Sequence, residues 1–249
     1  MSRFILAAVA AVLMAGAPAL AAEIKVFSAG AVEPGLVRAI EAFKRTSGEA
    51  VKVEFNTAPQ LASRLAAGEV ADVLIAPPAA LDREVKDGKV VADGRVTVGR
   101  VGAGMVVRAG LPSPDIATTA AFKQTMLGAD SIVYNTASSG LYLDKLFERL
   151  GIADAIKAKT TRYPNGERVM EHLIHGKGNE IGFGAITEIK LFEPKGLKLV
   201  GPLPAEVQNY TSYAAALMTG APAPQAAKAF LAFLGSAEAK QAFAAAGIE

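Results

Sequence analysis

The sequence predicts an α/β fold in which strands and helices alternate in layers. Two observations predict it. Short runs rich in β-branched and aromatic residues recur along the chain, and most are followed by a longer stretch with apolar residues at helical spacing. With 249 residues, the chain is long enough for one large lobe or two small ones, because domains commonly hold about 100–200 residues.

The first residues have the pattern of an export signal. A short head with one positive charge, Met1-Ser2-Arg3, precedes an apolar run from Phe4 to Met14 that is too brief to span a bilayer. Ala19-Leu20-Ala21 then gives an A-x-A processing site. We therefore expect residues 1–21 to be a signal peptide and the mature protein to work in the periplasm.

The predicted elements follow one another along the mature chain. The expected strands are Ile24–Phe27, Val51–Phe55, Val73–Ile75, Met105–Val107, Ser131–Val133, Ile181–Phe183, Leu197–Val200 and Ala214–Met218. The expected helices are Leu36–Thr46, Gln60–Ala67, Leu141–Leu150, Arg168–Ile174 and Pro224–Leu234, and the alanine-rich segment from Ala226 to Ala246 reads as two short terminal helices. The clearest helix is the third, whose leucines and phenylalanine share one face and which Gly151 follows as a stop.

Two shifts in composition mark places where the chain could cross between lobes. Val98–Gly104 holds three glycines just before a strand, and Gly201-Pro202-Leu203-Pro204 precedes the segment Val207–Tyr213. These positions predict one lobe from residues 22–99 plus 211–249 and a second from residues 100–210. One continuous sheet with ordinary turns explains the same spacing, so both arrangements stay open.

The composition excludes several functions. The net charge of +2 falls to +1 once Arg3 leaves with the signal, which argues against nucleic acid as a partner. The chain has no cysteine, and its two histidines, His172 and His175, lack a third ligand of the kind that zinc prefers. We therefore expect no metal, no cofactor and no disulfide. We also expect a monomer whose hydrophobic core is large enough to be stable without cross-links.

Three segments share a design that suits an anion. Each places small hydroxyl or amide residues between a strand and a helix: Ser28-Ala29-Gly30, Asn56-Thr57-Ala58-Pro59 and Asn135 to Gly140. A helix start carries about half a positive charge and up to four unpaired N–H donors, so three starts aimed at one point can hold an anion. For any one segment simple capping of the helix is the more common explanation of these residues, but all three follow strands, where α/β proteins bind ligands.

Two further residue types are candidates for the same site. Arg168, together with Arg100 and Arg162, falls near predicted loops and helix starts, and a guanidinium grips carboxylates in bidentate fashion. Tyr210 and Tyr213 lie on the segment that returns between the lobes, where a phenol can reach into a cleft. A surface position for the arginine and a packing role for each tyrosine are the alternatives.

Enzyme motifs are absent from the sequence. Gly176-Lys177-Gly178 does not match a phosphate-binding loop, and Ser138-Ser139-Gly140 lacks the G-x-S-x-G elbow of hydrolases. We expect a binding protein rather than an enzyme. An exported hydrolase or transferase that uses the hydroxyl of Ser28 or Ser139 is the alternative from a different class.

An ordered set of segments resembles the molybdate-binding proteins of ABC transporters. The set includes Val26–Gly30, Leu61–Ile75, Ser139–Tyr142, Gly182-Phe183-Gly184 and the closing segments from Tyr213 to Gly220 and from Ala226 to Ala246. This resemblance implies the type II periplasmic binding fold, in which two α/β lobes joined by two crossing strands enclose an anion. It also implies delivery of the anion to an ABC permease in the inner membrane.

The resemblance also assigns roles to individual residues. It implies a ligand-binding hydroxyl at Ser28, backbone donors near Ser139 and Gly184, and a tyrosine at Tyr213. The second serine of the family falls on Asn56–Pro59, so its hydroxyl is moved to Thr57 or lost, and Ser139 stands where the family usually contributes backbone only. A changed donor set alters which anion is accepted.

These arguments lead to one set of expectations. The protein binds a small anion, molybdate or tungstate by resemblance, or alternatively a di- or tricarboxylate held by the same helix starts plus an arginine. The ligand-binding residues are expected to be Ser28, Ala29, Gly30, Asn56, Thr57, Ala58, Ser138, Ser139, Gly140, Arg168, Gly184, Ala185, Tyr210 and Tyr213.

Overall fold

The computed structural model describes residues 23–249, so the predicted signal peptide lies outside the described residues. The strands are β1 (Ile24–Ala29), β2 (Val51–Asn56), β3 (Val73–Ala76), β4 (Val96–Arg108), β5 (Ser131–Asn135), β6 (Thr160–Tyr163), β7 (Glu180–Ala185), β8 (Leu197–Pro202) and β9 (Tyr210–Leu217). The helices are α1 (Glu33–Ser47), α2 (Ala58–Ala66), α3 (Pro78–Lys86), α4 (Thr119–Gly128), α5 (Ser138–Arg149), α6 (Ala153–Lys157), α7 (Gly166–His175), α8 (Ile186–Phe192), α9 (Pro224–Leu234) and α10 (Ala237–Ala245). Short 3-10 turns are η1 (Gly30–Val32), η2 (Glu193–Lys195) and η3 (Ala205–Val207).

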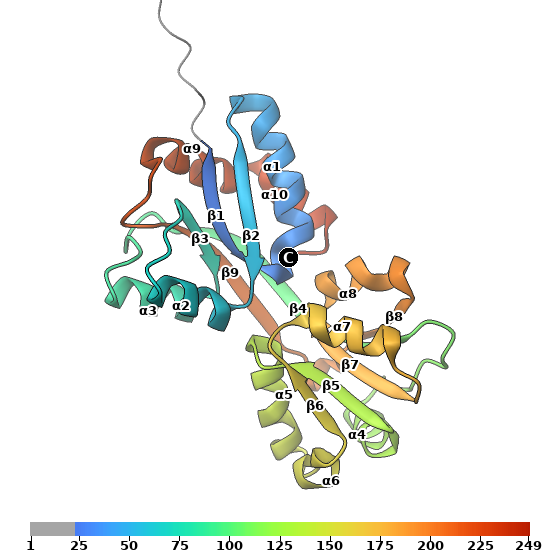
Figure 1. Cartoon of the computed structure of the whole chain (residues 1–249). Helices are drawn as coiled ribbons and strands as arrows, with labels where there is room; N and C mark the ends of the chain where they lie inside the picture. The colour runs from blue at the N-terminus through green and yellow to red at the C-terminus, as the bar shows by residue number, and fades with distance from the viewer. Residues whose placement is uncertain (1–22) are drawn as a thin grey trace, which may run out of the picture.

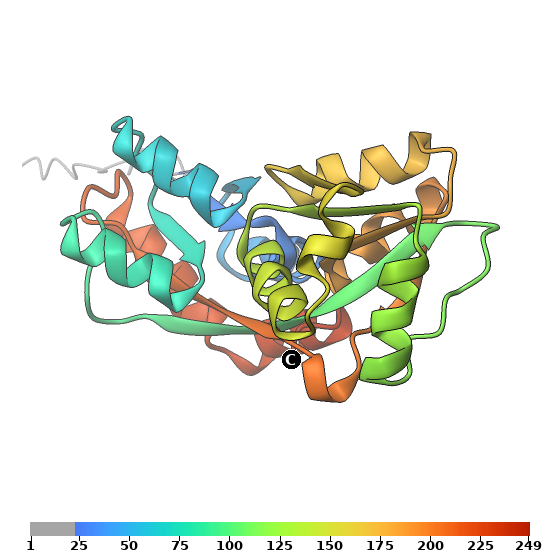
Figure 2. The ribbon, with the colours of Figure 1, turned by 90° about the horizontal axis from the view of Figure 1, so that it is seen from below.

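The strands join in the order β2-β1-β3-β9-β4-β7-β5-β6, with β8 added beside β4. In the first half of the sheet β1 pairs in parallel with both β2 and β3, and in the second half β5 pairs in parallel with both β6 and β7. The antiparallel strands β4 and β9 lie side by side between these two groups, as Figures 1 and 2 show. Each half therefore has its own set of parallel strands with carboxyl ends that can carry a site.

Separate hydrophobic cores lie on the two halves, and β4 contributes to both. Val98 and Val101 pack with α1, α9 and α10, whereas Ala103 and Met105 pack with α4 and α5. The strand thus passes from one core to the other around Gly102. The predicted lobe boundaries, 99/100 and 210/211, fall close to this passage and stay a prediction.

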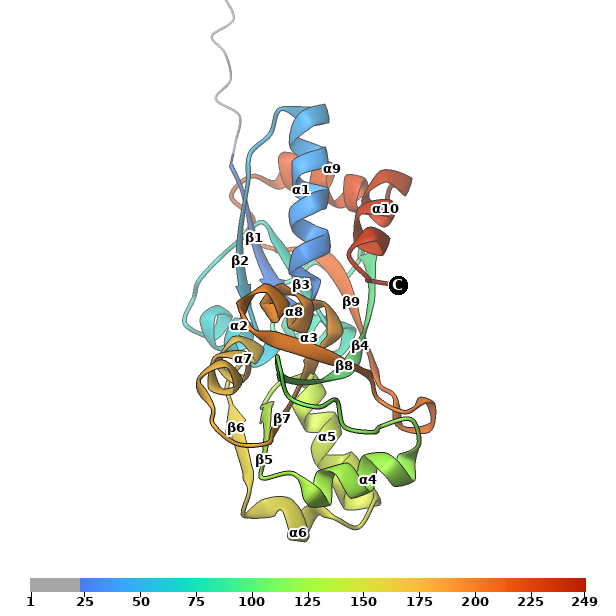
Figure 3. The same cartoon turned by 90° about the vertical axis from the view of Figure 1, so that its right-hand side faces the viewer.

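The helices at the end of the described chain return to its beginning. Helices α9 and α10 pack against α1, beside which they lie in Figures 1 and 3. Phe43 of α1 meets the rings of Phe230 and Phe233 with centroids 5.1 and 5.3 Å apart. Aromatic contacts of this kind add to the burial of apolar surface, and they hold α1 and α9 together.

Helix α8 joins the two halves. It packs on β8 and β4 of the second half and on η1 and α1 of the first (Figure 3). The buried Thr187 hydroxyl donates to the carbonyl of Ala31 across this contact. A segment of the second half is therefore tied to the turn that follows β1.

The predicted elements are confirmed, with shifts of a few residues at their ends and one larger difference at β4, which starts nine residues before the predicted Met105. Sequence reasoning missed β6, α3, α4, α6 and α8. Strand β6 reads Thr-Thr-Arg-Tyr and lies at the edge of the sheet, so it lacks the apolar run that marks a buried strand.

Candidate functional site

A cavity of about 630 Å³ lies between the two halves of the sheet. Its walls are formed largely by the residues that follow the carboxyl ends of six parallel strands, three from each half. They include Ala29–Ala31 at the end of β1, Asn56–Ala58 at the end of β2, Pro77 after β3, Ala137–Ser139 after β5, Asn165–Glu167 after β6, and Ala185 at the end of β7 with Glu188 beyond it. This is the place where open α/β sheets bind ligands.

Helix α2 begins at the cavity with a capped turn. The backbone N–H and the hydroxyl of Thr57 both donate to Oε1 of Gln60, each at 2.9 Å. Pro59 stands in the first turn, where its missing N–H costs nothing. These bonds fix the turn, and Ala58, the residue that follows Thr57, lines the cavity.

Helix α5 begins on the opposite wall, over the side chain of Asn135. Oδ1 of Asn135 accepts the N–H groups of Ala137 and Gly140 at 2.9 and 3.3 Å. Among the hydrogen bonds of residues 23–249, the N–H groups of Ser138 and Ser139 have no partner. Both serines line the cavity, and their N–H groups are of the unpaired kind that a helix start offers to an anion.

Helix α7 supplies a third start, which sequence reasoning did not propose as a site. Oδ1 of its N-cap, Asn165, accepts the N–H of Arg168 at 3.0 Å. Gly166 and Glu167, the next two residues, line the cavity. The signal was present in the sequence, because Asn165-Gly166-Glu167 sets a capping residue before the apolar face of a helix.

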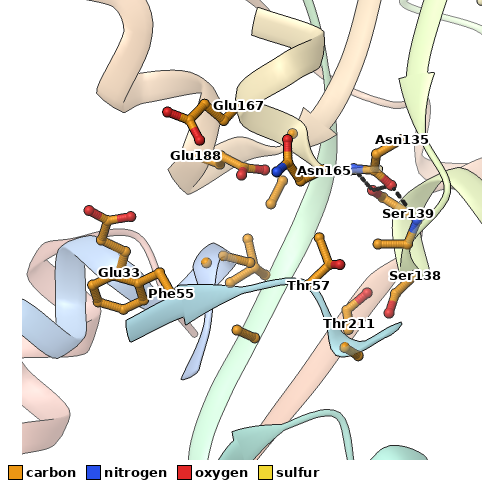
Figure 4. A pocket seen from close by; sticks show the side chains of 18 of the residues that line it. Glu33, Phe55, Thr57, Asn135, Ser138, Ser139, Asn165, Glu167, Glu188 and Thr211 are labelled. Carbon is orange, nitrogen blue, oxygen red and sulfur yellow. Dashed lines mark hydrogen bonds between the residues drawn. The ribbon is translucent and has the colours of Figure 1, made fainter. Parts of the chain in front are cut away.

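The cavity has two chemically different ends (Figure 4). Neutral donors and acceptors gather at one end: Thr57, Asn135, Ser138, Ser139, Asn165 and Thr211. Carboxylates gather at the other end, where Glu33 lies beside Phe55 and Glu188 lies near Glu167. We call these the hydroxyl end and the acidic end of the cavity.

The acidic end shifts the pKa values of its own groups. Burial first, and then the negative charges of Glu33 and Glu167, together raise the pKa of Glu188 to about 7. Burial and Glu167 also raise the pKa of Glu33, while Lys195 opposes the shift. Tyr213 lies close enough that Glu188 contributes to raising the pKa of its phenol, after burial. Desolvation and like charges act together here.

Nine of the fourteen predicted ligand-binding residues line the cavity. They are Ala29, Gly30, Asn56, Thr57, Ala58, Ser138, Ser139, Ala185 and Tyr213. The structure thus brings together all three predicted helix starts and one of the two tyrosines.

The other five predicted residues do not line the cavity. The hydroxyl of Ser28 is fully buried in β1 and donates to the carbonyl of Ala29 at 3.2 Å. Gly140 lies beneath the first turn of α5, where a Cβ would overlap the carbonyl of Asn135. Gly184 is buried behind Glu188, with the methyl of Met170 against it.

Arg168 and Tyr210 point elsewhere because other partners hold them. The guanidinium of Arg168 pairs with Glu171 on the outer face of α7, at 3.0 Å. Tyr210 is 43% exposed, and the guanidinium of Arg100 lies 4.4 Å from the centre of its ring. The third arginine considered, Arg162, pairs with Asp144 at 2.9 Å. No arginine lines the cavity within the described residues, and its single lysine there is Lys195.

The cavity also contains residues that sequence reasoning missed. Besides Asn165 and the three glutamates, they include Gln60, Asn135, Asn209, Thr211 and Lys195. Asn135 stood inside a predicted helix start and its capping role was readable. Glu188 carried no local signal, because it lies in a short helix whose position depends on the contact of α8 with η1 and α1.

Neither histidine reaches this cavity. His172 contacts the hydroxyl of Tyr163 at 2.9 Å and Oε1 of Glu180 at 3.3 Å, in a separate depression on the outer side of α7. Ser139 therefore has no histidine beside it, and its hydroxyl interacts with Asn135 instead. Among residues 23–249 no group of three or more His, Asp or Glu side chains is arranged to hold a metal ion. No helix of this range is long and apolar enough to cross a membrane.

Comparison with known proteins gives the family context. Residues 24–249 match the family described as "Bacterial extracellular solute-binding protein". A protein of Pseudomonas sp. named "Aconitate isomerase" is 34% identical over 254 residues, which cover 97% of this chain and 95% of that protein.

Solved structures share the fold at low sequence identity. The sulfate-binding protein SubI of Mycobacterium tuberculosis H37Rv has a TM-score of 0.75 at 19% identity, covering 91% of this chain and 86% of that one. The periplasmic molybdate-binding protein of Azotobacter vinelandii has a TM-score of 0.74 at 16% identity, covering 91% and 98%. The fold is that of the type II periplasmic binding proteins, as the resemblance to molybdate-binding proteins implied.

Proposed function

The chain belongs to the family of bacterial extracellular solute-binding proteins, and on this basis we propose that it binds a small di- or tricarboxylate between its two halves and delivers it to an ABC permease. Apart from Lys195, the donors that the cavity supplies carry no formal charge, which suits a ligand that must be released again. The helix starts of α2, α5 and α7 would each hold a carboxylate. Lys195 takes the place of the arginine that we expected.

One observation carries the proposal: three helix starts from separate strands open into one cavity. Each start offers free N–H donors and a partial positive charge of about one half. A ligand with two or three carboxylates, set apart on a short carbon chain, can meet several starts at once. A ligand with a single anionic centre would contact only one of these helix starts at a time.

The size of the cavity supports a carbon acid over a tetrahedral oxyanion. The cavity measures about 630 Å³, which is in the range of about 300–1,000 Å³ typical of pockets for small organic molecules. Molybdate, which the sequence resemblance put first, is therefore our second choice.

The relative named "Aconitate isomerase" supports the same ligand class. Aconitate is an unsaturated tricarboxylate, and an identity of 34% over nearly the whole of both chains favours related ligands in the two cavities. The carboxylate class rests on this name together with the donors described above.

Calorimetric titration of the mature protein tests the proposal. The panel consists of tricarballylate, citrate, trans-aconitate and succinate, with molybdate, tungstate and sulfate as the competing class. We expect saturable binding of at least one tricarboxylate and much weaker or no binding of the three inorganic anions. Binding of molybdate or tungstate alone would overturn the carboxylate assignment and restore the oxyanion.

A second candidate function is isomerisation of an unsaturated polycarboxylate. The specific observation in its favour is Glu188, a carboxyl at the cavity whose pKa of about 7 suits a group that accepts and returns a proton near neutral pH. In this reaction the glutamate removes a proton from the CH2 beside the double bond, the freed C–H electron pair forms a new C=C, and the old C=C pair takes a proton at its far carbon. The double bond moves, no electrons are gained or lost, and no cofactor is needed.

Proton NMR of a pure geometric isomer of aconitate tests this second candidate. An isomerase would convert it to the other isomer and, in D2O, introduce deuterium at the exchanging carbon. Glu188→Gln would lose turnover and retain binding. A wild-type protein that is saturated with the ligand and leaves its C–H protons unexchanged has no such activity, and the binding function stands alone.

A further inference from the structure

Glu188 occupies an unusual position for a carboxylate. It lies in the first turn of α8, and its side chain reaches the cavity near Asn165 and Glu167 (Figure 4). A Cβ added to Gly166 would overlap its carboxyl group, and a Cβ on Gly30 or Gly184 would lie 3.7 or 3.8 Å from one of its oxygens. Gly166 of α7 therefore leaves the room that this side chain needs, whereas side chains at Gly30 of η1 and Gly184 of β7 would only be in ordinary contact with it.

The charged groups around Glu188 come from four elements and are mostly of its own sign. Glu33 faces it from α1 and Glu167 from α7, while the phenol of Tyr213 lies toward it from β9. Lys195 of η2 lines the same cavity and acts on Glu33. Within residues 23–249 no salt bridge or hydrogen bond joins the Glu188 carboxyl to another group.

These surroundings conflict with an anionic ligand. A dianion or trianion would bring further negative charge to a cavity that already holds three carboxylates and one lysine. Two like charges about 4 Å apart repel by roughly 4 kcal/mol at the effective dielectric near a protein surface. A protonated glutamate removes its own charge, and its O–H becomes a donor.

We propose, resting on the carboxylate-binding function above, that Glu188 takes up a proton as the ligand binds and that its neutral carboxyl donates a hydrogen bond to a ligand carboxylate. The solute is thus taken up as a proton-coupled complex, and Glu188 becomes the residue that makes affinity depend on pH. The missing side chain of Gly166 leaves the space that the carboxyl occupies.

The pKa of Glu188 in the ligand-free protein, about 7, sets the pH above which the affinity for the ligand should fall. Below this pH the glutamate already carries its proton and binding has full strength. Above it the proton must be taken up at binding, so Kd rises about tenfold for each pH unit. At pH 8 ten of every eleven free molecules have an ionised Glu188, so binding takes up about 0.9 proton.

Calorimetry in buffers of different ionisation enthalpy measures this proton directly. The probe is tricarballylate, titrated from pH 6 to pH 9 into the wild type, Glu188→Gln and the control Glu148→Gln, whose side chain is exposed on α5. The wild type and the control should take up about 0.9 proton at pH 8 and lose affinity tenfold per unit above pH 7. The amide of Glu188→Gln should take up none, and at pH 9 it should bind about a hundredfold more tightly than the wild type.

Each result decides something different. Equal pH slopes for the wild type and Glu188→Gln overturn the inference and leave the binding function intact. Absence of binding by the wild type at every pH overturns the proposed function itself. If Glu188→Gln does not fold, Glu167→Gln takes its place: it removes a neighbouring charge, so the midpoint of the pH profile must move to lower pH, and an unmoved midpoint contradicts the inference.

Discussion

Asn165→Asp separates the two roles of the α7 start. Aspartate and asparagine cap helices about equally well, so the bond from the Arg168 N–H to Oδ1, 3.0 Å in the wild type, should persist. The substitution nevertheless adds a full negative charge to the wall of the cavity. The helix should stay and the anion should be repelled.

The size of the effect follows from Coulomb's law. A charge about 6 Å from a ligand carboxylate, at an effective dielectric of about 20, costs about 3 kcal/mol. That is roughly a hundredfold in Kd, at about 1.4 kcal/mol for each factor of ten. Because the cavity is open to solvent, which screens the charge, we expect a loss between about tenfold and a hundredfold.

The assay is calorimetric titration of tricarballylate into the variant, with urea unfolding as a measure of stability. The control is Gln225→Glu, which makes the same change from amide to carboxylate at an exposed position of α9. The control should bind like the wild type. If Asn165→Asp binds as tightly as the wild type while remaining folded, the start of α7 does not face the ligand and the reasoning fails.

Three further outcomes follow from the packing. Gly140→Ala should destabilise the protein by about 2 kcal/mol or more, because its Cβ would overlap a backbone carbonyl. The control Gly128→Ala has open space around the new Cβ and should be neutral or slightly stabilising. Thermal unfolding compares the two variants. Asp72→Ala should lower the free energy of unfolding in urea by about 2–4 kcal/mol, since the buried carboxylate accepts two backbone N–H groups at 2.8 and 2.6 Å. A loss below about 0.5 kcal/mol, which is the size usual for surface substitutions, would contradict this. Glu188 should destabilise the folded state as pH rises from about 4.5 to about 7, because its pKa of about 7 in the folded state lies above the unfolded value. Glu188→Gln should therefore be more stable than the wild type at pH 8, by up to about 3 kcal/mol, and equal to it near pH 4.5. A difference in stability that is the same at both pH values would refute the assignment.

Local patterns were sufficient for the helix starts of α2 and α5. A capped turn after a strand is predicted by the residues Asn56–Ala58 and again by Asn135–Ser139. Both turns lie at the cavity. Their convergence also followed from a general rule, that ligands bind where the strands of an α/β sheet end.

The start of α7 was missed because the strand before it could not be recognised in the sequence. The strand before it, β6, is a polar edge strand of four residues, so no apolar run indicated that Asn165 follows a strand. The cap itself was readable, and only its place relative to the sheet was hidden.

Long-range contacts explain what no local pattern could predict. Glu188 reaches the cavity because α8 packs across the two halves, and Ser28 turns into the core even though its position in the chain matches a ligand-binding serine of a similar family. Arg168 was expected in the cleft for its chemistry, and its neighbour Glu171 holds it on the outer face of α7. The direction in which a side chain points depends on the residues that contact it in the fold, and local sequence patterns do not show which residues these are.

A crystal structure of the mature protein with its tightest-binding tricarboxylate tests the central claim most directly. We predict a ligand in the cavity whose carboxylates accept N–H groups from the starts of α2, α5 and α7, including those of Ser138, Ser139 and Gly166. A ligand held instead by Arg168, or one that leaves the three helix starts untouched, would contradict it.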